Sequence, residues 1–548
     1  MLRAAAIESY RSLTSRFLTG LALLGASWAT VAPADDALGV RVPDGFEVSL
    51  YADDELAHDI YSMTVDAFGR VVVSGAGYVR ILIDADNDGR AESFKEYSSE
   101  PKSGAQGMFF YGRDLICLGD AGLLRYTDRD GDDKADGAPQ VFVKLNSGGE
   151  HDAHAIRKGP DGWWYLICGN MAGVNEKYNT LPNAPVKTPR AGTMMRFTPD
   201  LAKGEIIAHG LRNAYDFDFN VFGDIYTFDS DGEREITLPW YEPTRLYQLV
   251  PGADCGWFAK SYKRPEYFLD MPPVLDSFGR SSPTGLVTYR HTQFPAQYQG
   301  ALFALDWTYG RIWALPMQAD GSTWTTKPIE FMTAVGEHGF APTDAEVGPD
   351  GSLFVSVGGR GTRGAVYRIR KSSNEPARIA PPPSDATTTE EKLAQCLTAP
   401  QPLSSWSRMR WEPLVKELKA PLIIEAALDA SRSPAERVRA IEILTEKFNG
   451  LDSDMLNRLA ASNAPAVKAR AAWSLGRTSP ATPNVDYLRS CLTDKQPLVV
   501  RMALESLEGA DDAVLLDLAG PIAGQLGSGD RLIRQTAVRL LTRSSVDT

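Results

Sequence analysis

One phrase recurs six times between residues 65 and 359: a turn that contains glycine, followed directly by a short run of large apolar residues. The turn glycines are spaced by 43, 50, 61, 77 and 51 residues, and each interval has room for a four-stranded sheet and its loops. They are Gly69, Gly112, Gly162, Gly223, Gly300 and Gly351. Six such sheets stacked radially in a closed ring bury one another's apolar faces and leave no free edge. The sequence therefore predicts an all-β six-bladed propeller over residues 41–370, because a jelly roll or sandwich would not repeat one phrase six times.

A change of composition marks the end of the predicted propeller. Residues 371–391 are rich in Pro, Ser, Thr and Ala, which cannot build a core, and we interpret them as a linker. From 392 to 548 the apolar residues follow a helical period, with prolines 31 and 32 residues apart and arginines at similar intervals. These residues are Pro434, Pro465 and Pro497, and Arg439, Arg470, Arg501 and Arg534. The pattern is typical of HEAT-like helix pairs, so we predict an all-α HEAT-like solenoid that offers a concave surface to a protein partner.

The N-terminus has the three parts of an export signal. Three arginines precede an apolar run over residues 17–32, and Ala32-Pro33-Ala34 follows as a small-residue cleavage site. We predict a signal peptide over residues 1–34 and a periplasmic or secreted protein. An uncleaved membrane anchor is the alternative, although the run is shorter than the roughly 20 apolar residues that span a bilayer. No later segment is as apolar, so we expect no stable membrane span after cleavage.

Charge and cysteine content exclude several classes of function. The formal net charge of −13 opposes binding to phosphate backbones, so nucleic acid is not an expected partner. The five cysteines form no C-x-x-C and no C-x-x-C-H, which excludes a zinc cluster and attached c-type haem. We expect Cys117, Cys168 and Cys255 to be small buried hydrophobes, with one disulfide among them as the alternative.

Two acidic loops, DADNDGRAE (84–92) and DRDGDDKAD (128–136), place carboxylates at the same four positions. The carboxylates are Asp84, Asp86, Asp88 and Glu92 in the first loop and Asp128, Asp130, Asp132 and Asp136 in the second. Alternate carboxylates on a tight turn converge on one point, which suits calcium and its six to eight oxygen ligands. The loops start 44 residues apart, at equivalent points of consecutive blades. This placement favours structural calcium over two solvated turns, although neither loop has the last glutamate of an EF-hand.

The segment GGEHDAHAIRKGPDG (148–162) holds two of the six histidines, and His151 stands eight residues ahead of the Gly-Pro-Asp turn at 159–161. In this pattern the chain resembles the soluble, pyrroloquinoline-quinone-dependent glucose and sorbosone dehydrogenases. The resemblance implies that His151 is the general base that takes the sugar hydroxyl proton as hydride passes to the quinone. It also places Asn170 where the family has an aspartate that orients this base.

A second match to the same family is HGLRNAYDF (209–217). The resemblance implies that Arg212 and Asn213 bind the quinone, whose carboxylates suit a guanidinium fork and whose carbonyls suit an amide. Gln106, in SGAQGMFF, is similar to a glutamine that helps to seat the cofactor. Asp231 and Gly232 match the positions where the family holds a calcium that bridges to the quinone.

The chain also departs from this family. The family's cofactor-binding lysine would fall near Thr308 and its late arginine pair within 341–343, where this sequence has no cation; Arg311 and Arg360 are nearby substitutes. Phrases such as LPWYEPTR and DWTYGRI resemble the membrane-bound dehydrogenase type of bacterial protein. That type joins this propeller to HEAT-like repeats and often to a haem domain. The resemblance, without a haem motif here, implies a separate electron acceptor.

We therefore predict an oxidoreductase that oxidises a sugar or related alcohol, with quinone and calcium held at the propeller axis. One alternative is a non-catalytic propeller that binds glycan or protein ligands. Another is a calcium-dependent hydrolase or lactonase, in which several carboxylates would converge on one axial metal. The candidate carboxylates for this hydrolase or lactonase site are Asp216, Asp218, Asp229 and Asp344.

Overall fold

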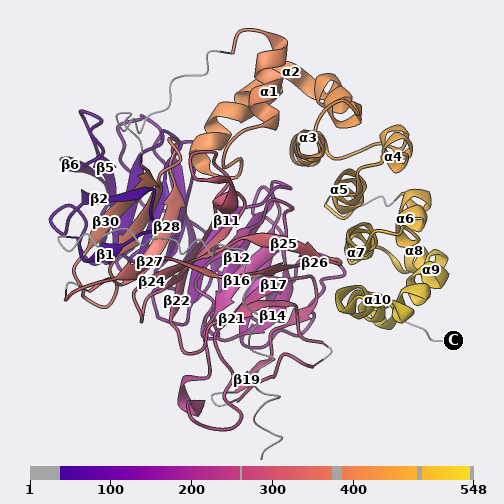
Figure 1. Ribbon diagram of the computed structural model, residues 1–548, viewed down its shortest axis with the longest axis horizontal. Coiled ribbons are helices and arrows are strands. Elements are labelled where there is room, and N and C mark those ends of the chain that lie inside the picture. Colours follow the sequence, from indigo (N-terminus) through magenta and orange to yellow (C-terminus); the bar gives the residue numbers. More distant parts are fainter. Residues whose placement is uncertain are drawn as a thin grey trace, which may run out of the picture.

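The computed structural model describes residues 38–259, 262–268, 270–337, 339–372, 386–477 and 484–543. The predicted signal peptide lies outside these residues, as do residues 373–385 of the predicted linker. Six sheets form one part of the molecule, and the helices form an arc along one side of it (Figure 1).

The six sheets follow one another along the chain as the blades of a propeller. Blade 1 contains β3 (Ser62–Val65), β4 (Val71–Gly75), β5 (Tyr78–Ile83) and β6 (Ser93–Ser98). Blade 2 contains β7 (Gly107–Tyr111), β8 (Asp114–Gly119), β9 (Gly122–Tyr126) and β10 (Gln140–Lys144). Blade 3 contains β11 (Ala153–Lys158), β12 (Trp164–Cys168), β13 (Gly192–Phe197), β14 (Gly204–Leu211) and β18 (Ala253–Asp254). Blade 4 contains β15 (Phe217–Phe219), β16 (Ile225–Asp229), β17 (Arg245–Leu249) and β21 (Val274–Ser277). Blade 5 contains β22 (Pro283–Thr288), β23 (Leu302–Asp306), β24 (Arg311–Leu315), β27 (Ile329–Ala334) and β1 (Val40–Arg41). Blade 6 contains β28 (Pro342–Val347), β29 (Leu353–Val357), β30 (Ala365–Lys371) and β2 (Phe46–Ala52). Two hairpins, β19 (Trp257–Ala259) with β20 (Tyr262–Lys263) and β25 (Met317–Asp320) with β26 (Thr323–Thr326), complete the β-structure of the described residues.

The N-terminal strands close the ring. β2 pairs antiparallel with β30, with Phe46 opposite Lys371 and Leu50 opposite Tyr367. β1 in the same way adds to the outer edge of blade 5 through β27. The first strands of the chain therefore complete the last two blades, which covers edges that would otherwise be open to pairing.

The predicted turn glycines all lie between the first and second strands of their blades. Each has a positive φ, for example 79° at Gly162 and 84° at Gly351, which is a conformation that residues with a side chain rarely adopt. A Cβ on Gly351 would also lie 2.2 Å from Nδ1 of His291. The repeated phrase thus marks one structural turn in every blade, and the prediction of a six-bladed propeller is confirmed.

The C-terminal part is helical throughout its described residues, as predicted. Its helices are α1 (Thr389–Leu397), α2 (Ser405–Leu428), α3 (Pro434–Phe448), α4 (Ser453–Ala460), α5 (Pro465–Leu475), α6 (Val485–Leu492), α7 (Pro497–Ser506), α8 (Asp512–Asp517), α9 (Ala519–Gly524) and α10 (Arg531–Arg543). The three recurring prolines are the first residues of α3, α5 and α7, a position where the missing N–H costs nothing. These helices stack in order, and α10 follows α7. The assignment of this region to the HEAT-like type stays a prediction.

The helical region packs directly on the strand 1 to strand 2 turns of the propeller. Arg501 of α7 is fully buried, and its Nη2 lies 2.6 Å from Oδ1 of Asp224 in the blade 4 turn. Arg470 of α5 donates to the carbonyl of Phe222 in the same turn. Arg408 Nη2 of α2 donates to the Gly159 carbonyl of blade 3 at 3.0 Å. Two of the four recurring arginines therefore bind the protein's own propeller.

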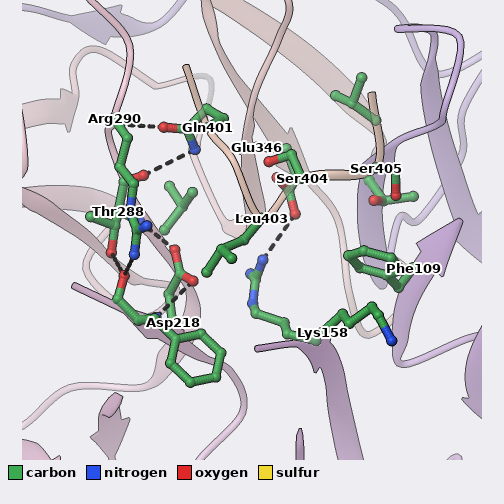
Figure 2. A pocket seen from close by; sticks show the side chains of 15 residues that line it. Phe109, Lys158, Asp218, Thr288, Arg290, Glu346, Gln401, Leu403, Ser404 and Ser405 are labelled. Atoms are coloured by element: carbon green, nitrogen blue, oxygen red, sulfur yellow. Dashed lines mark hydrogen bonds and ion pairs between the residues drawn. The ribbon is translucent and has the colours of Figure 1, made fainter. Parts of the chain in front are cut away.

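The segment that leads into α2 closes one end of the central channel, because it contributes to the lining of a small cavity there together with residues from all six blades. Figure 2 shows Gln401, Leu403, Ser404 and Ser405 of this segment at the cavity. Gln401 donates through Nε2 to the carbonyl of Thr288 at 3.1 Å and accepts the backbone N–H of Arg290, both in or next to blade 5. Ser405 Oγ donates to the Phe110 carbonyl of blade 2, and Trp406 Nε1 to the Val347 carbonyl of blade 6 at 3.0 Å. The cavity left between this segment and the blades is about 30 Å³, which is close to the space of one water molecule.

All five cysteines are buried and free, so the interpretation of Cys117, Cys168 and Cys255 as small hydrophobes is confirmed over the disulfide. None of the described helices combines the length and the apolar character that a bilayer crossing needs.

Candidate functional site

A pocket of about 300 Å³ lies at the end of the channel opposite to the closing segment. The innermost strands of the six blades are β3, β7, β11, β15, β22 and β28. Residues at the starts of all six line the pocket, whereas the closing segment contacts the ends of those strands. Among the lining residues are Tyr61, Gln106, Glu150, Arg212, Asn213, Tyr215, Glu233, Thr284, Trp307, Thr343 and Arg360. The volume is at the lower end of the range for small-molecule sites.

Three residues that the sequence predicted as cofactor ligands meet in this pocket, each next to the start of an innermost strand. Gln106 directly precedes β7 of blade 2, and Arg212 and Asn213 precede β15 of blade 4. The backbone N–H groups of Arg212 and Asn213 both donate to Asp229 Oδ1, at 3.0 and 2.8 Å. Asp229 is itself paired with the buried Lys263, 3.3 Å away. This buried pair fixes the loop that carries the two predicted ligands.

Two guanidinium groups reach the pocket wall. Arg212 donates to Ser230 Oγ at 2.7 Å and pairs with Glu233 at 3.1 Å. Arg360 pairs with Glu150, and its guanidinium carbon lies 5.4 Å from the centroid of the Trp307 ring. Arg360 therefore takes a place at the axis, while Arg311, the other expected substitute, pairs with Asp306 at 2.9 Å.

The predicted base and its predicted orienting residue are in contact. His151 Nδ1 lies 2.7 Å from Asn170 Oδ1, and both side chains are partly buried. Their contact arises because residues 151 and 170 flank the β11–β12 hairpin. Glu150 lines the pocket and His151 is the next residue in the chain; His151 is not among the residues that line the pocket directly.

A second histidine, His154, lies fully buried in β11, below the pocket. Its Nε2 is 2.9 Å from Asn213 Oδ1, and its ring stacks on Tyr215 with the centroids 4.1 Å apart. Tyr215 in turn donates its hydroxyl to Gln106 Oε1 at 2.6 Å. In the sequence, the only signal for this network is the position of His154 near His151.

The structure places the other predicted cofactor residues beside the pocket. The Asp231 side chain is almost fully buried and accepts the Tyr241 hydroxyl at 2.6 Å. Gly232 precedes Glu233, which does line the pocket. The carboxylates that face the pocket are therefore those of Glu233 and Glu150 rather than that of Asp231.

The axial carboxylates that would serve a hydrolase bind the backbone instead. Asp216 accepts the N–H of Leu286, at 2.9 Å, and Asp218 that of Thr288, at 2.7 Å, which ties blade 4 to blade 5. Asp344 accepts the N–H of Met63, which ties blade 6 to blade 1. Asp229 accepts the N–H groups of Arg212 and Asn213. Burial raises the pKa of Glu346, which faces Arg157 in the channel, to about 7. Asp216, Asp344 and Glu346 line one channel cavity of about 20 Å³, so their oxygens surround a space no larger than about one water molecule.

The two acidic loops adopt matching positions in blades 1 and 2, between the third and fourth strands. Ligand oxygens of Asp84, Asp86, Asp88 and Glu92 all lie within 4.8 Å of one another, and so do those of Asp128, Asp130 and Asp132. Asp136 accepts the backbone N–H of Arg129 at 2.7 Å, and Glu92 makes the equivalent bond with Ala85 at 2.8 Å. The structure therefore brings together seven of the eight predicted ligands, in two groups.

Acid is expected to destabilise the fold through His154. Burial lowers the pKa of His154 to about 4, while an unfolded chain takes up this proton near pH 6.5. Between these values the unfolded state binds more protons, so stability falls as the pH falls, by about 3 kcal/mol at pH 4. Urea denaturation of the wild type and His154→Gln at pH 7 and at pH 4.5 measures this loss. A loss of equal size in both proteins would contradict the assignment.

Comparison with known proteins gives one family and a group of distant structures. The family model described as a domain of unknown function (DUF7133) matches residues 32–356. The glucose dehydrogenase-type oxidoreductase of Thermus thermophilus is 17% identical, with a TM-score of 0.45 over 59% of this chain and 100% of its own. The quinone domain of Coprinopsis cinerea pyranose dehydrogenase is 15% identical, with a TM-score of 0.45 over 60% and 97%. The quinone-bound aldose sugar dehydrogenase of Streptomyces coelicolor is 15% identical, with a TM-score of 0.42 over 60% and 100%. No protein of curated function matches the chain.

Proposed function

We propose that this chain, which belongs to the DUF7133 family, is an oxidoreductase that oxidises a sugar or related alcohol with pyrroloquinoline quinone in its axial pocket. The observation that carries the proposal is the meeting of Gln106, Arg212 and Asn213 in one pocket. These are the residues that the sequence resemblance assigns to the cofactor, and they come from two separate blades. The predicted signal peptide supports a periplasmic or secreted location.

The groups in the pocket fit a flat anionic quinone. The amide oxygens of Gln106 and Asn213 are already hydrogen-bonded within the protein, so their N–H groups are left to donate to carbonyl oxygens. Trp307 and Tyr61 offer aromatic surface beside them. A quinone bound here would supply the hydride acceptor for oxidation of an alcohol carbon.

The two arginines would hold the carboxylates of the quinone. Their present partners are exposed: the side chain of Glu233 is 52% accessible and that of Glu150 is 60% accessible. The pair of Arg360 with Glu150 is exposed on both sides and such pairs contribute only about 0–1 kcal/mol, so a ligand carboxylate can displace Glu150 at little cost. Arg212 is more buried, and a ligand carboxylate would take the place of the exposed Glu233 beside it. Because no lysine lines the pocket in the described residues, we expect binding to depend strongly on Arg212 and Arg360.

The hydroxyl proton of the substrate would pass to His151. Asn170 Oδ1 is an acceptor, so it holds the proton of His151 on Nδ1 and leaves the lone pair of Nε2 as the basic site. A neutral amide sets the ring orientation but does not stabilise the imidazolium by charge, as a carboxylate would.

We further propose that calcium binds the two acidic loops and stabilises blades 1 and 2. Millimolar calcium is expected to raise the melting temperature by a few degrees, since a ligand at about 100 times its Kd contributes about 2.7 kcal/mol. The double variant Asp84→Asn with Asp128→Asn should lose most of this rise, and the exposed control Asp454→Asn should keep it. Differential scanning calorimetry with calcium and with a chelator measures the effect. Equal shifts in both variants would assign the calcium effect to other sites.

The enzymatic proposal is tested by reduction of a redox dye by purified protein given pyrroloquinoline quinone, over a panel of aldoses and alcohols. We expect quinone-dependent turnover with at least one of them. Quinone binding without turnover on any member of the panel would contradict the oxidoreductase and favour a ligand-binding propeller.

A further inference from the structure

His154 contacts the Asn213 side chain of the axial pocket directly, and it is linked to the Gln106 side chain through Tyr215. The direct contact joins His154 Nε2 to Asn213 Oδ1 at 2.9 Å. The indirect contact is the stacking of its ring on Tyr215, with an interplanar angle of 24°, and the bond from the Tyr215 hydroxyl to Gln106 Oε1 at 2.6 Å. Gln106, Asn213 and Tyr215 line the pocket, whereas His154 is fully buried and does not.

The direct contact fixes which end of the Asn213 amide faces the pocket. Asn213 Oδ1 can only accept, so His154 must carry its proton on Nε2. The oxygen points toward blade 3 and lies close to the backbone of Gly169, where an added Cβ would come within 2.8 Å of it. With the oxygen held on this side, the NH₂ group of Asn213 is the end that remains for a ligand.

The Gln106 amide is oriented in a similar way. Its Oε1 accepts the hydroxyl of Tyr215, whose ring is held in place by the stacked imidazole. The Gln106 NH₂ group therefore also remains free to donate to a ligand. Two amide side chains that could each offer an acceptor or a donor are thus both set to donate.

We propose that His154 is a positioning residue that sets both pocket amides as donors, so that the pocket selects ligands with adjacent acceptor oxygens such as quinone carbonyls or carboxylates. This inference rests on the proposed function for the identity of the ligand, but the orientation of the amides does not depend on it. His154 touches neither the ligand nor the reacting atoms. Its effect passes through Asn213 and Tyr215.

Two substitutions of His154 separate the effect of its Nε2–H donor from the effect of its ring stacked on Tyr215. His154→Phe keeps an aromatic ring to stack on Tyr215 but removes the N–H that holds Asn213. His154→Gln places an amide N–H close to the position of Nε2. We expect His154→Phe to weaken binding of pyrroloquinoline quinone at least tenfold, which is the loss of about one well-placed hydrogen bond, and His154→Gln to stay within about threefold of the wild type. Fluorescence titration of folded protein, with denaturation midpoints measured alongside, gives both values.

Crystal structures of the ligand-free wild type and His154→Phe test the orientation without any cofactor. We expect Asn213 Oδ1 to lie against His154 in the wild type and to turn toward the pocket in the variant. Quinone binding by His154→Phe equal to that of the wild type, or an unchanged Asn213 in its structure, would overturn the inference. If the wild type itself binds no quinone, the proposed function fails, and the two structures alone decide the role of His154.

Discussion

Replacement of His151 by alanine is expected to lower the rate of quinone-dependent sugar oxidation by about 10²–10⁴-fold, the usual contribution of a general base. The imidazole is the only group that we assign to take the hydroxyl proton, and the 2.7 Å contact between Nδ1 and Asn170 leaves the lone pair of Nε2 free to accept it. His151 is not among the residues that line the pocket directly, so the Kd for the quinone should stay within about threefold of the wild type. Steady-state kinetics with quinone at saturation, together with a separate quinone titration, distinguish the two effects.

The partner of His151 offers a matched pair of variants. Asn170→Asp would place a carboxylate against Nδ1, which stabilises the imidazolium formed in the transition state, and we expect a rise in kcat of about tenfold. Asn170→Ala removes the orienting contact and should lower kcat instead. A His151→Ala protein with wild-type kcat would exclude His151 as the base, whatever the quinone affinity.

Replacement of Arg501 by alanine is expected to reduce the free energy of unfolding by about 3–5 kcal/mol, as for other buried ion pairs that lose one member. Arg501 has no accessible side-chain surface, and it lies 2.6 Å from Asp224 and 3.7 Å from Glu505. Its removal would leave two buried carboxylates at the junction of α7 and blade 4 without their shared cation. Because the pair joins the two parts of the molecule, the helical region should also become more open to proteolysis.

An exposed pair in the same region provides the control. Arg489 and Asp517 are 3.1 Å apart, but their side chains are 41% and 57% accessible, so Arg489→Ala should change stability by less than about 1 kcal/mol. The double variant Arg501→Leu with Asp224→Asn should recover part of the loss, because it also removes one of the two uncompensated carboxylates. Urea denaturation of all three variants measures these differences. An Arg501→Ala loss no larger than that of Arg489→Ala would show that the junction does not depend on this pair.

Much of the architecture could be predicted because it depends on local backbone chemistry. A glycine with positive φ is needed in each strand 1 to strand 2 turn, and a proline is favoured at the first position of α3, α5 and α7. Both signals repeat with the structural unit, so they reveal its period. The contact of His151 with Asn170 also follows from a short hairpin, whose strands pair directly.

Contacts between distant segments could not be predicted in this way. The closing segment at Gln401 to Trp406 lies in a stretch with no distinctive motif, and its place at the channel end depends on hydrogen bonds to blades 2, 5 and 6. The recurring arginines predicted a helical repeat but not that Arg470 and Arg501 bind blade 4. The link from His154 through Asn213 and Tyr215 to Gln106 joins three blades, and no spacing in the sequence encodes it.

Calorimetric titration of the purified protein with pyrroloquinoline quinone tests the central claim most directly, with Arg212→Leu and the exposed control Arg458→Leu measured in parallel. We predict saturable binding of one quinone per chain, weakened at least tenfold in Arg212→Leu and unchanged in Arg458→Leu, because only the first guanidinium faces the axial pocket. No saturable binding by the wild type, or equal binding by both variants, would contradict a quinone site at the propeller axis.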